Sequence, residues 1–290
     1  MKKIILLGHT VGVKFIIDSL ISKSNEFRVA GVVTHPKEDH LRDLNLMSKR
    51  KGIYGDYSYN VFDIQKDYGI KIIEAKDVND NETLNWIKKI DPSYIISVGC
   101  RNILKTKFLN IFPKKVLNIH TAPLPKYRGA ASDSWMILNG ELGKEQYGVC
   151  HFIDEGIDTG AIIAVSKYKL PKRAYPIDIH KIRMDVFQDI IIKTLKNLKN
   201  PDFKPKIQDP SKSTVFPRLF TPNDGKILFD LFNGNEIDLF VQAFGYPFEG
   251  AFCFLGDKKI NILDAEFVKK KLFHSYANGL IFGKNLKGQY

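Results

Sequence analysis

The chain has 290 residues, of which 44% are hydrophobic and 26% are charged, and its formal net charge at pH 7 is +12. This composition excludes a disordered, collagen-like or coiled-coil protein and leaves enough apolar material for a sizeable core. The three cysteines, Cys100, Cys150 and Cys253, are too few and too far apart for a disulfide framework or a thiolate metal cluster. No stretch approaches the roughly 20 apolar residues of a membrane span. We therefore expect a soluble cytoplasmic protein without a metal.

The positive charge is compatible with an anionic partner, and its distribution along the chain narrows the choice. Residues 201–290 contain 12 Lys and Arg against 10 Asp and Glu, so they carry +2 and the first 200 residues carry +10. The longest basic runs are the triplets at 49–51 and 269–271. Short, scattered runs of this kind are typical of solvated lysine-rich surfaces and do not favour a nucleic-acid footprint.

The first half of the chain alternates strands with helices. Short apolar runs predict five buried strands, at residues 4–7, 27–33, 70–73, 94–98 and 116–119. Helical spacing of apolar residues follows the first strand, and another helical stretch lies near 82–89. This alternation is typical of a doubly wound, mostly parallel α/β sheet of Rossmann-like type, whose ligands collect at the carboxyl ends of the strands. Polar residues 36–60 predict an insertion, which we interpret as a lid over substrate.

The second half predicts the rest of the main domain and a smaller domain after it. Residues 121–129 contain Pro123 and Pro125 and predict an ordered loop. The main domain then continues to residue 200 with a helix at Ala131–Leu138, strands at Gly148–Phe152 and Ile162–Tyr168, and a long helix at Ile177–Leu198. A proline-rich linker at 201–213 leads to a small mixed α+β domain at 214–290, built from Lys226–Phe229, a helix near Glu236–Phe244 and strands near Ala251–Leu255 and Lys259–Phe267.

Asn118 and His120 end the fifth predicted strand, and Asp158 lies in the turn at 154–160. Residues two apart in a strand point to the same side, so the amide and the imidazole would face one cleft. An amide can stabilise an oxyanion while an imidazole handles protons and a carboxylate orients it, which suits acyl transfer. The turn at 8–12 lacks the G-x-G-x-x-G spacing of a dinucleotide site, although its backbone could still hold an anion.

The sequence around these residues resembles the 10-formyltetrahydrofolate-dependent formyltransferases. The resemblance rests on Leu-Asn-Ile-His at 117–120, Leu-Pro-Lys-Tyr-Arg-Gly at 124–129 and the segment 148–160, which ends in Asp-Thr-Gly. It implies a catalytic triad of Asn118, His120 and Asp158, with 10-formyltetrahydrofolate as formyl donor and no metal. In the implied mechanism, Asn118 and protonated His120 donate to the oxyanion, and Asp158 positions His120 and helps to remove the ammonium proton.

The resemblance also implies two binding regions. The pterin of the donor would lie against the loop formed by Ile153, Asp154, Glu155, Gly156 and Ile157, with Val98, Gly99, Cys100 and Arg101 nearby. The acceptor would enter beside Gly8, His9 and Thr10, close to Lys126, Tyr127 and Arg128, with Arg218 at its phosphates and Phe244 and Tyr246 stacked on its base. Two alternatives remain open from the residues alone: Asp154 as a turn cap, and the aromatic residues as core.

Residues 217–227 and 242–252 look like C-terminal signatures shared by tRNA and sugar-nucleotide formyltransferases, which makes a purine-biosynthesis enzyme unlikely on resemblance. Many relatives carry a serine where this chain has Ala122, and some 4-amino-arabinose enzymes carry an arginine where Ala130 stands. The small charge of 201–290 favours a nucleotide-linked amino sugar over methionyl-tRNA. We expect a homodimeric enzyme that formylates dTDP-4-amino-4,6-dideoxyglucose for O-antigen and lipopolysaccharide biosynthesis. The alternatives are a methionyl-tRNA formyltransferase and a folate-binding sensor without transfer activity.

Overall fold

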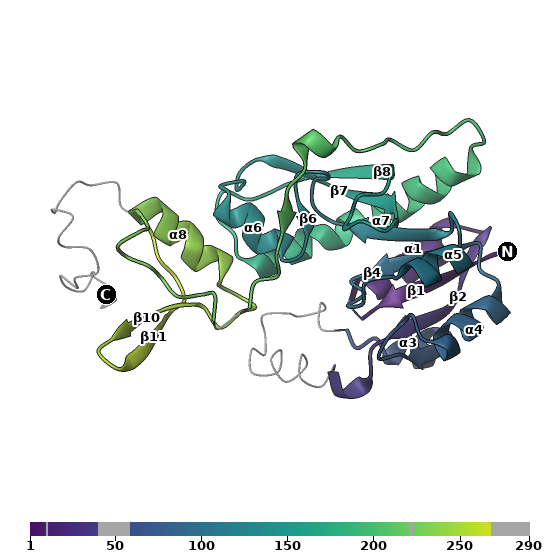
Figure 1. Ribbon diagram of the computed structural model, residues 1–290, viewed down its shortest axis with the longest axis horizontal. Helices are drawn as coiled ribbons and strands as arrows, with labels where there is room; N and C mark the ends of the chain where they lie inside the picture. The colour runs from purple at the N-terminus through teal and green to yellow at the C-terminus, as the bar shows by residue number, and fades with distance from the viewer. Residues whose placement is uncertain (10, 40–58, 221–222, 268–290) are drawn as a thin grey trace.

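The computed structural model describes residues 1–9, 11–39, 59–220 and 223–267, and a seven-stranded sheet forms its centre (Figure 1). The strand order is β3-β2-β1-β4-β5-β7-β8. The strands are β1 (Lys2–Gly8), β2 (Phe27–Thr34), β3 (Ile72–Glu74), β4 (Tyr94–Val98), β5 (Val116–His120), β7 (Glu145–Phe152) and β8 (Ile162–Lys169). The first five of these pair in parallel, and β7 and β8 are antiparallel. The predicted mostly parallel α/β sheet is confirmed.

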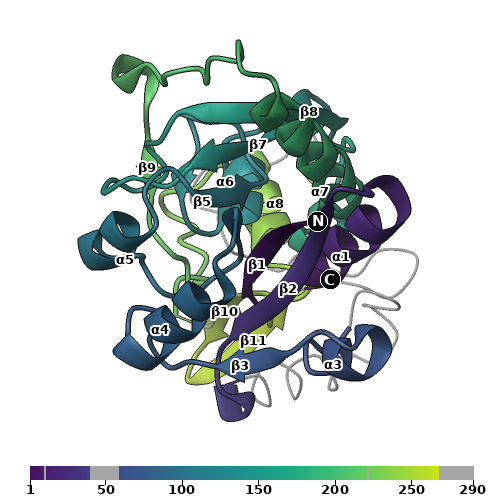
Figure 2. The ribbon, with the colours of Figure 1, turned by 90° about the vertical axis from the view of Figure 1, so that its right-hand side faces the viewer.

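Helices cover both faces of this sheet (Figure 2). On one face lie α1 (Val11–Lys23) and α7 (Pro176–Lys199), and on the other lie α4 (Asn81–Ile90) and α5 (Thr106–Ile111). Strand β1 shows why its sequence is a continuous apolar run: Ile4 and Leu6 belong to the core beneath α1 and α7, whereas Ile5 and Leu7 belong to the core beneath α4 and α5. A strand that is buried on both faces needs apolar residues at every position.

The order in which strands are added to the sheet changes direction between β1 and β4, and the site lies at this position. From β1 the chain first builds outward through β2 and β3 and then returns to add β4 and β5 on the other side. The carboxyl ends of β1, β4 and β5 therefore meet at a topological switch point, where open α/β sheets bind ligands. Gly8 ends β1 so close to β4 that a Cβ there would lie 2.1 Å from the carbonyl oxygen of Val98.

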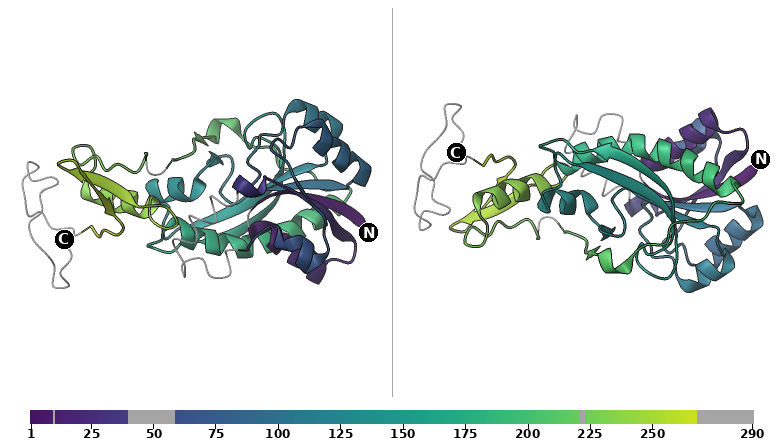
Figure 3. Two further views of the ribbon diagram at one scale, coloured as in Figure 1. Left: turned by 90° about the horizontal axis from the view of Figure 1, so that it is seen from below. Right: turned by 90° about the horizontal axis from the view of Figure 1, so that it is seen from above.

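The remaining elements after β5 are β6 (Arg128–Gly129), α6 (Ser132–Leu138), the 3-10 turn η2 (Pro210–Lys212), β9 (Val215–Phe216), α8 (Gly234–Ala243), β10 (Ala251–Leu255) and β11 (Lys258–Ile262). Of these, α8, β10 and β11 form one end of an elongated molecule (Figure 3). Helix α8 packs on α6, where the Ser134 hydroxyl donates to the Ala243 carbonyl at 2.8 Å. The elements after β9 therefore contact the rest of the protein through α6.

Several elements differ from the sequence predictions. Within Lys226–Phe229, for which no element type was predicted, Lys226 forms an isolated bridge to Phe252. Strand β11 ends at Ile262 instead of residue 267, where its pairing with β10 stops. The short helices α3 (Asp63–Tyr68) and α5 have six residues each, too few for a periodic pattern to reveal. The helix predicted at Ile177–Leu198 is confirmed as α7.

Two expectations from composition concern membranes and metals. Within the described ranges, no helix has the length and apolar character needed to cross a membrane. The same residues contain no group of three or more His, Cys, Asp and Glu side chains that could hold a metal ion. Most of the expected lid, residues 40–58, lies outside the part of the chain that the structure describes.

Candidate active site

The structure brings Asn118, His120 and Asp158 together at the carboxyl end of β5. The Asn118 amide nitrogen Nδ2 lies 3.3 Å from Asp158 Oδ1. On the other side of the same carboxylate, His120 Nδ1 lies 3.6 Å from Oδ2. The alternation of strand β5 puts Asn118 and His120 on one face, as the sequence predicts, and the turn after β7 delivers the carboxylate to them.

His120 is buried, and its second ring nitrogen is already engaged. Nε2 lies 2.6 Å from the Tyr127 carbonyl oxygen, which can only accept, so the ring donates from Nε2. Burial lowers the pKa of His120 below 6.5, although the neighbouring Asp158 carboxylate opposes this shift. Burial thus opposes the protonated His120 implied by resemblance, and the Asp158 carboxylate beside Nδ1 favours it.

Asp158 has an unusual backbone conformation, and its side-chain carboxylate is surrounded by neighbouring groups. Its φ is +52°, in the left-handed region that non-glycine residues rarely adopt. The Gly129 backbone N–H donates to Oδ2 at 2.9 Å. Burial raises the pKa of Asp158, but the His151 and His120 side chains and the Gly129 N–H outweigh burial and lower the pKa to about 2. The carboxylate is therefore charged at neutral pH.

His151 completes the group, and sequence reasoning missed it. It stands opposite Asn118 in the antiparallel pairing of β5 with β7 and is only 1% exposed. Its Nε2 lies 3.2 Å from Asn118 Nδ2 and 3.5 Å from Asp158 Oδ1, while Nδ1 donates to the Phe152 carbonyl. The sequence did show a lone histidine in an apolar strand, seven residues before Asp158. Its position opposite Asn118, however, follows only from the register between β5 and β7.

A cavity of about 170 Å³ opens beside this group. It is lined by Ser97, Cys100, Asn102, Ile103, Leu104, Asn118, His151, the loop 153–157 and Asp158. The predicted donor-binding loop and Cys100 therefore do face one cavity. Val98 does not, because it is fully buried in the core, and Arg101 is not among the lining residues. The cavity combines apolar walls with the amides of Asn102 and Asn118, which suits a flat heterocycle with polar edges.

The loop that carries the donor-site residues is fixed by one carboxylate. Asp154 Oδ1 accepts from the Gly156 backbone N–H at 3.3 Å and from the Thr159 hydroxyl. Asp154 thus fills the turn-capping role that the sequence left open. Burial raises the pKa of the Cys100 thiol to about 11, so this cysteine lines the cavity as a neutral group.

The residues predicted for the acceptor divide into those at the surface and those inside the protein. Tyr127 is fully buried, stacks on Phe216 with ring centroids 5.3 Å apart and donates to Glu141. The Arg128 guanidinium is buried and donates to Gln208. Phe244 is 2% exposed and packs on Phe240 in the core. The side chains of these three predicted substrate contacts are buried and engaged in packing or hydrogen bonds inside the protein.

Four other predicted acceptor residues, Lys126, His9, Tyr246 and Arg218, lie at the surface or at the edge of the sheet. Lys126 pairs with Glu141 at 2.6 Å, yet its side chain stays 58% exposed. His9 follows Gly8 at the end of β1 and packs edge-on against His35. Tyr246 is 37% exposed. Arg218 is exposed two residues after β9, and Thr10 lies outside the described residues.

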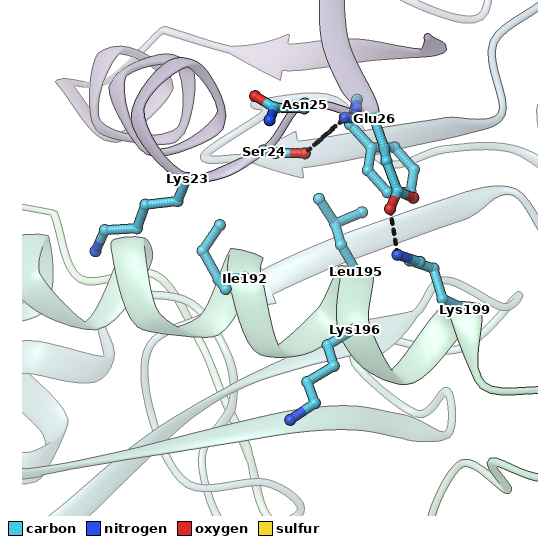
Figure 4. A pocket seen from close by; sticks show the side chains of 9 residues that line it. Lys23, Ser24, Asn25, Glu26, Ile192, Leu195, Lys196 and Lys199 are labelled. Carbon is cyan, nitrogen blue, oxygen red and sulfur yellow. Dashed lines mark hydrogen bonds and ion pairs between the residues drawn. The ribbon is translucent and has the colours of Figure 1, made fainter.

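A larger hollow of about 320 Å³ lies at the opposite end of the sheet (Figure 4). It is bordered by the end of α1, the start of β2 and the last turns of α7. Lys199 pairs with Glu26 at 2.5 Å, and the side chains of Lys23 and Lys196 extend apart from one another. These lysines do not converge on a common point, so the hollow lacks the arrangement of an anion site.

The fold and the site define an α/β protein whose polar group lies at the sheet's switch point. The chain belongs to the formyl transferase family, since the family's sequence model, described as "Formyl transferase", matches residues 2–178. That range includes Asn118, His120 and His151 as well as Asp158. The family assignment and the mostly parallel fold confirm the resemblance seen in the sequence.

Individual relatives include enzymes with two kinds of acceptor in their names. The methionyl-tRNA formyltransferase of Finegoldia magna is 29% identical over 204 residues, which are 70% of this chain and 64% of that protein. The corresponding protein of Clostridium tetani is 26% identical over 272 residues, covering 93% and 82% of the two chains. The solved N-formyltransferase of Helicobacter canadensis, in complex with folinic acid and dTDP-3-aminofucose, shares the fold with a TM-score of 0.62 at 22% identity, over 85% of this chain and 81% of that one.

Proposed function

We propose that this chain transfers the formyl group of 10-formyltetrahydrofolate to the primary amine of a nucleotide-linked amino sugar. The observation that carries the proposal is the grouping of Asn118, His120, His151 and Asp158 beside one cavity, inside the range that matches the formyl transferase family. The apolar walls and amides of that cavity fit a pterin ring. The bound folate would supply an activated formyl carbon.

The proposed chemistry assigns a role to each side chain. Attack of a neutral amine on a formyl carbon places negative charge on the former carbonyl oxygen and positive charge on the nitrogen. The Asn118 amide, which now contacts His151 and Asp158, would turn one hydrogen toward that oxygen. Asp158 would stabilise the ammonium and receive its proton, and His120 would hold Asp158 in place. The bond between the formyl carbon and N10 of the folate would then break, N10 would take up the proton, and tetrahydrofolate and the N-formyl product would leave.

We favour an amino-sugar acceptor, with dTDP-4-amino-4,6-dideoxyglucose for O-antigen synthesis as the specific candidate. Residues 201–290 carry a formal charge of only +2, which gives little electrostatic attraction for a tRNA backbone. The Helicobacter canadensis structure contains a dTDP-linked amino sugar, which supports this class. The second candidate is methionyl-tRNA, because the Finegoldia magna and Clostridium tetani relatives carry that activity in their names.

The proposal is tested by mass spectrometry of an amino-sugar nucleotide after incubation with the protein and 10-formyltetrahydrofolate. We expect a gain of one formyl group, and a loss of about 100-fold or more in rate for Asn118→Ala, which removes the oxyanion donor. Asn200→Ala, at the exposed end of α7, serves as the control and should match the wild type. An undiminished rate in Asn118→Ala would contradict the assigned role.

A further inference from the structure

The segment that joins the two parts of the chain runs through the active site. We call residues 206–216 the connector. It begins at Lys206, whose backbone exchanges two hydrogen bonds of 2.8 Å with Ile162 at the start of β8. It ends at β9, which pairs with β6 beside the Tyr127 carbonyl that binds His120. Sequence reasoning assigned most of this stretch to a linker, but its backbone is bound along both walls of the site.

Gln208 lies at the centre of the connector and is only 6% exposed. Its amide nitrogen donates to the carbonyl oxygens of Asp158 and Gly160, both at 2.8 Å. Its amide oxygen accepts from the Arg128 guanidinium, from Nη2 at 2.9 Å and from Nε at 3.2 Å. One side chain therefore makes four hydrogen bonds that join the Asp158 turn to the loop after β5.

The turn that Gln208 binds has a backbone conformation that its own residues disfavour, so it needs contacts from outside. Asp158 has a φ of +52°, which is disfavoured for a residue with a Cβ. A Cβ at Gly160 would lie 1.8 Å from the Phe152 carbonyl oxygen, so the backbone there is fixed against β7. The inward-facing carbonyls of this turn need donors, because buried backbone oxygens are costly to leave unpaired.

The loop after β5, which the connector also binds, holds the side chain of Asp158. Arg128 is followed by Gly129, whose N–H donates to Asp158 Oδ2 at 2.9 Å. Backbone bonds from Arg128 to Thr214 and from Ala130 to Phe216 fix this loop to the connector. The backbone and the side chain of Asp158 are thus both fixed through contacts that end on the connector.

We propose that Gln208 is a positioning residue for Asp158 and that the connector is part of the active site. The inference rests on the proposed formyl transfer, for which Asp158 must lie beside both His120 and the incoming amine. It also means that the catalytic unit does not end at residue 200, where the sequence placed its boundary. A position in the connector then controls turnover without itself touching either substrate.

Two substitutions separate the two halves of the Gln208 side chain. Gln208→Glu keeps the oxygen that accepts from Arg128 but replaces the donor with an oxygen that faces two carbonyls. Gln208→Met has a similar length and keeps neither interaction. Asp202→Asn is the control, since Asp202 is exposed and lies outside the connector.

The experiment measures kcat and KM for formyl transfer, thermal unfolding, and binding of 5-formyltetrahydrofolate, which reports donor affinity without turnover. We expect both Gln208 variants to lose about 10- to 100-fold in kcat, as a misplaced reacting group does, while KM for the donor and the Kd for 5-formyltetrahydrofolate change less than about threefold. Asp202→Asn should retain wild-type kcat. In this outcome the kcat of Gln208→Glu falls even though this variant keeps the oxygen that accepts from Arg128.

Two results would overturn the inference. Wild-type kcat in Gln208→Glu would show that donation to the Asp158 turn is not needed. Equal losses of kcat, folate affinity and unfolding temperature would show that Gln208 supports the fold in general. A wild-type protein that transfers no formyl group to any acceptor contradicts the proposed function itself, and is distinguished from these results by the wild-type arm of the same assay.

Discussion

At Asp158, burial and hydrogen bonding act on the carboxyl in opposite directions. Burial alone would raise its pKa, but the contacts from His151, His120 and the Gly129 N–H lower the pKa to about 2. The carboxylate is consequently present throughout the pH range in which an amine nucleophile can be neutral. A charged carboxylate beside a developing ammonium stabilises it and can accept its proton.

Asp158→Asn tests this assignment at the scale of a single residue. The substitution keeps the size of the side chain and removes its charge, so we expect kcat for formyl transfer to fall by about 10²- to 10⁴-fold. Asp185→Asn, at an exposed position of α7, is the control for loss of one carboxylate and should have wild-type kcat. The assignment is contradicted if Asp158→Asn keeps more than about a third of wild-type kcat.

Some residues of the site can be predicted from the sequence, and others cannot. Asn118 and His120 follow from the period of a strand, and Asp158 from its motif. The motif also suggested Tyr127 and Arg128 as substrate contacts, although the structure buries both side chains. A sequence motif shows which residue type occupies a position, but it does not show whether that residue binds a ligand or packs inside the protein. Gln208 gave no signal at all, because its three partner residues, Arg128, Asp158 and Gly160, are distant in sequence.

At the scale of elements, the pairing of β6 with β9 depends on a glycine. Gly129 has a φ of +94°, and a Cβ there would lie 2.2 Å from the Phe216 carbonyl oxygen. Gly140 has a φ of +64° but nothing within 4 Å of an added Cβ. Both positions have a positive φ, and they differ in the contact that an added Cβ would make, so they can be compared directly.

Gly140→Ala should destabilise the protein by about 1–2 kcal/mol, the cost of a left-handed alanine. We expect Gly129→Ala to cost more, because the methyl group would also separate β6 from β9, and to lower kcat, because the Gly129 N–H binds Asp158. Chemical denaturation of both variants measures the difference. Equal destabilisation would show that the close contact with Phe216 can relax.

Helix α7 carries a histidine whose burial links folding to pH. Burial, with a further contribution from the charge of Arg183, lowers the pKa of His180 to about 4 from the ordinary 6.5. Between pH 6.5 and 4 the unfolded chain binds a proton at this position that the folded chain excludes. The free energy of unfolding therefore decreases as pH falls through this window. Burial lowers the pKa of His120 too, which adds to the effect in the same direction.

His180→Gln should reduce this pH dependence. We expect the wild-type unfolding temperature to drop more between pH 7.5 and pH 5 than that of His180→Gln, since glutamine does not titrate. At pH 7.5 both side chains are neutral, so the comparison at that pH corrects for any loss of packing. Identical drops in the two proteins would show that His180 keeps its ordinary pKa in the folded state.

The elements themselves were predictable where burial leaves a periodic trace. Strand β1 is buried on both faces and gave a continuous apolar run, and α7 is long enough to show its helical period. Strands β6 and β9 have two residues each and are defined only by pairing with each other. The position of His151 opposite Asn118 depends in turn on the register between β5 and β7, which neither strand encodes alone.

At the scale of the whole molecule, the hairpin of β10 and β11 stands at the end farthest from the N-terminus (Figure 1). It exposes apolar side chains that a solvated hairpin would not need: Phe254 is 52% exposed and Leu255 is 61% exposed. A two-stranded hairpin is also marginal without a packed face. We propose that this surface is covered by a second copy of the chain.

Size-exclusion chromatography with light scattering tests the proposed homodimer. We expect the mass of two chains for the wild type and of one chain for Leu255→Lys, which introduces a charge into the apolar surface. Ile21→Lys, at an exposed apolar position on α1 near the other end of the molecule, is the control and should remain dimeric. A wild-type protein with the mass of one chain would contradict the proposal.

The identity of the acceptor is the central claim, and one assay tests it directly. The protein is incubated with 10-formyltetrahydrofolate and, separately, with dTDP-4-amino and dTDP-3-amino dideoxyhexoses, a UDP-4-amino pentose and methionyl-tRNA, and each product is weighed by mass spectrometry. The proposed function predicts one added formyl group on a dTDP-amino sugar and none on the tRNA. Formylation of methionyl-tRNA alone would contradict it and would assign the basic first 200 residues to RNA binding.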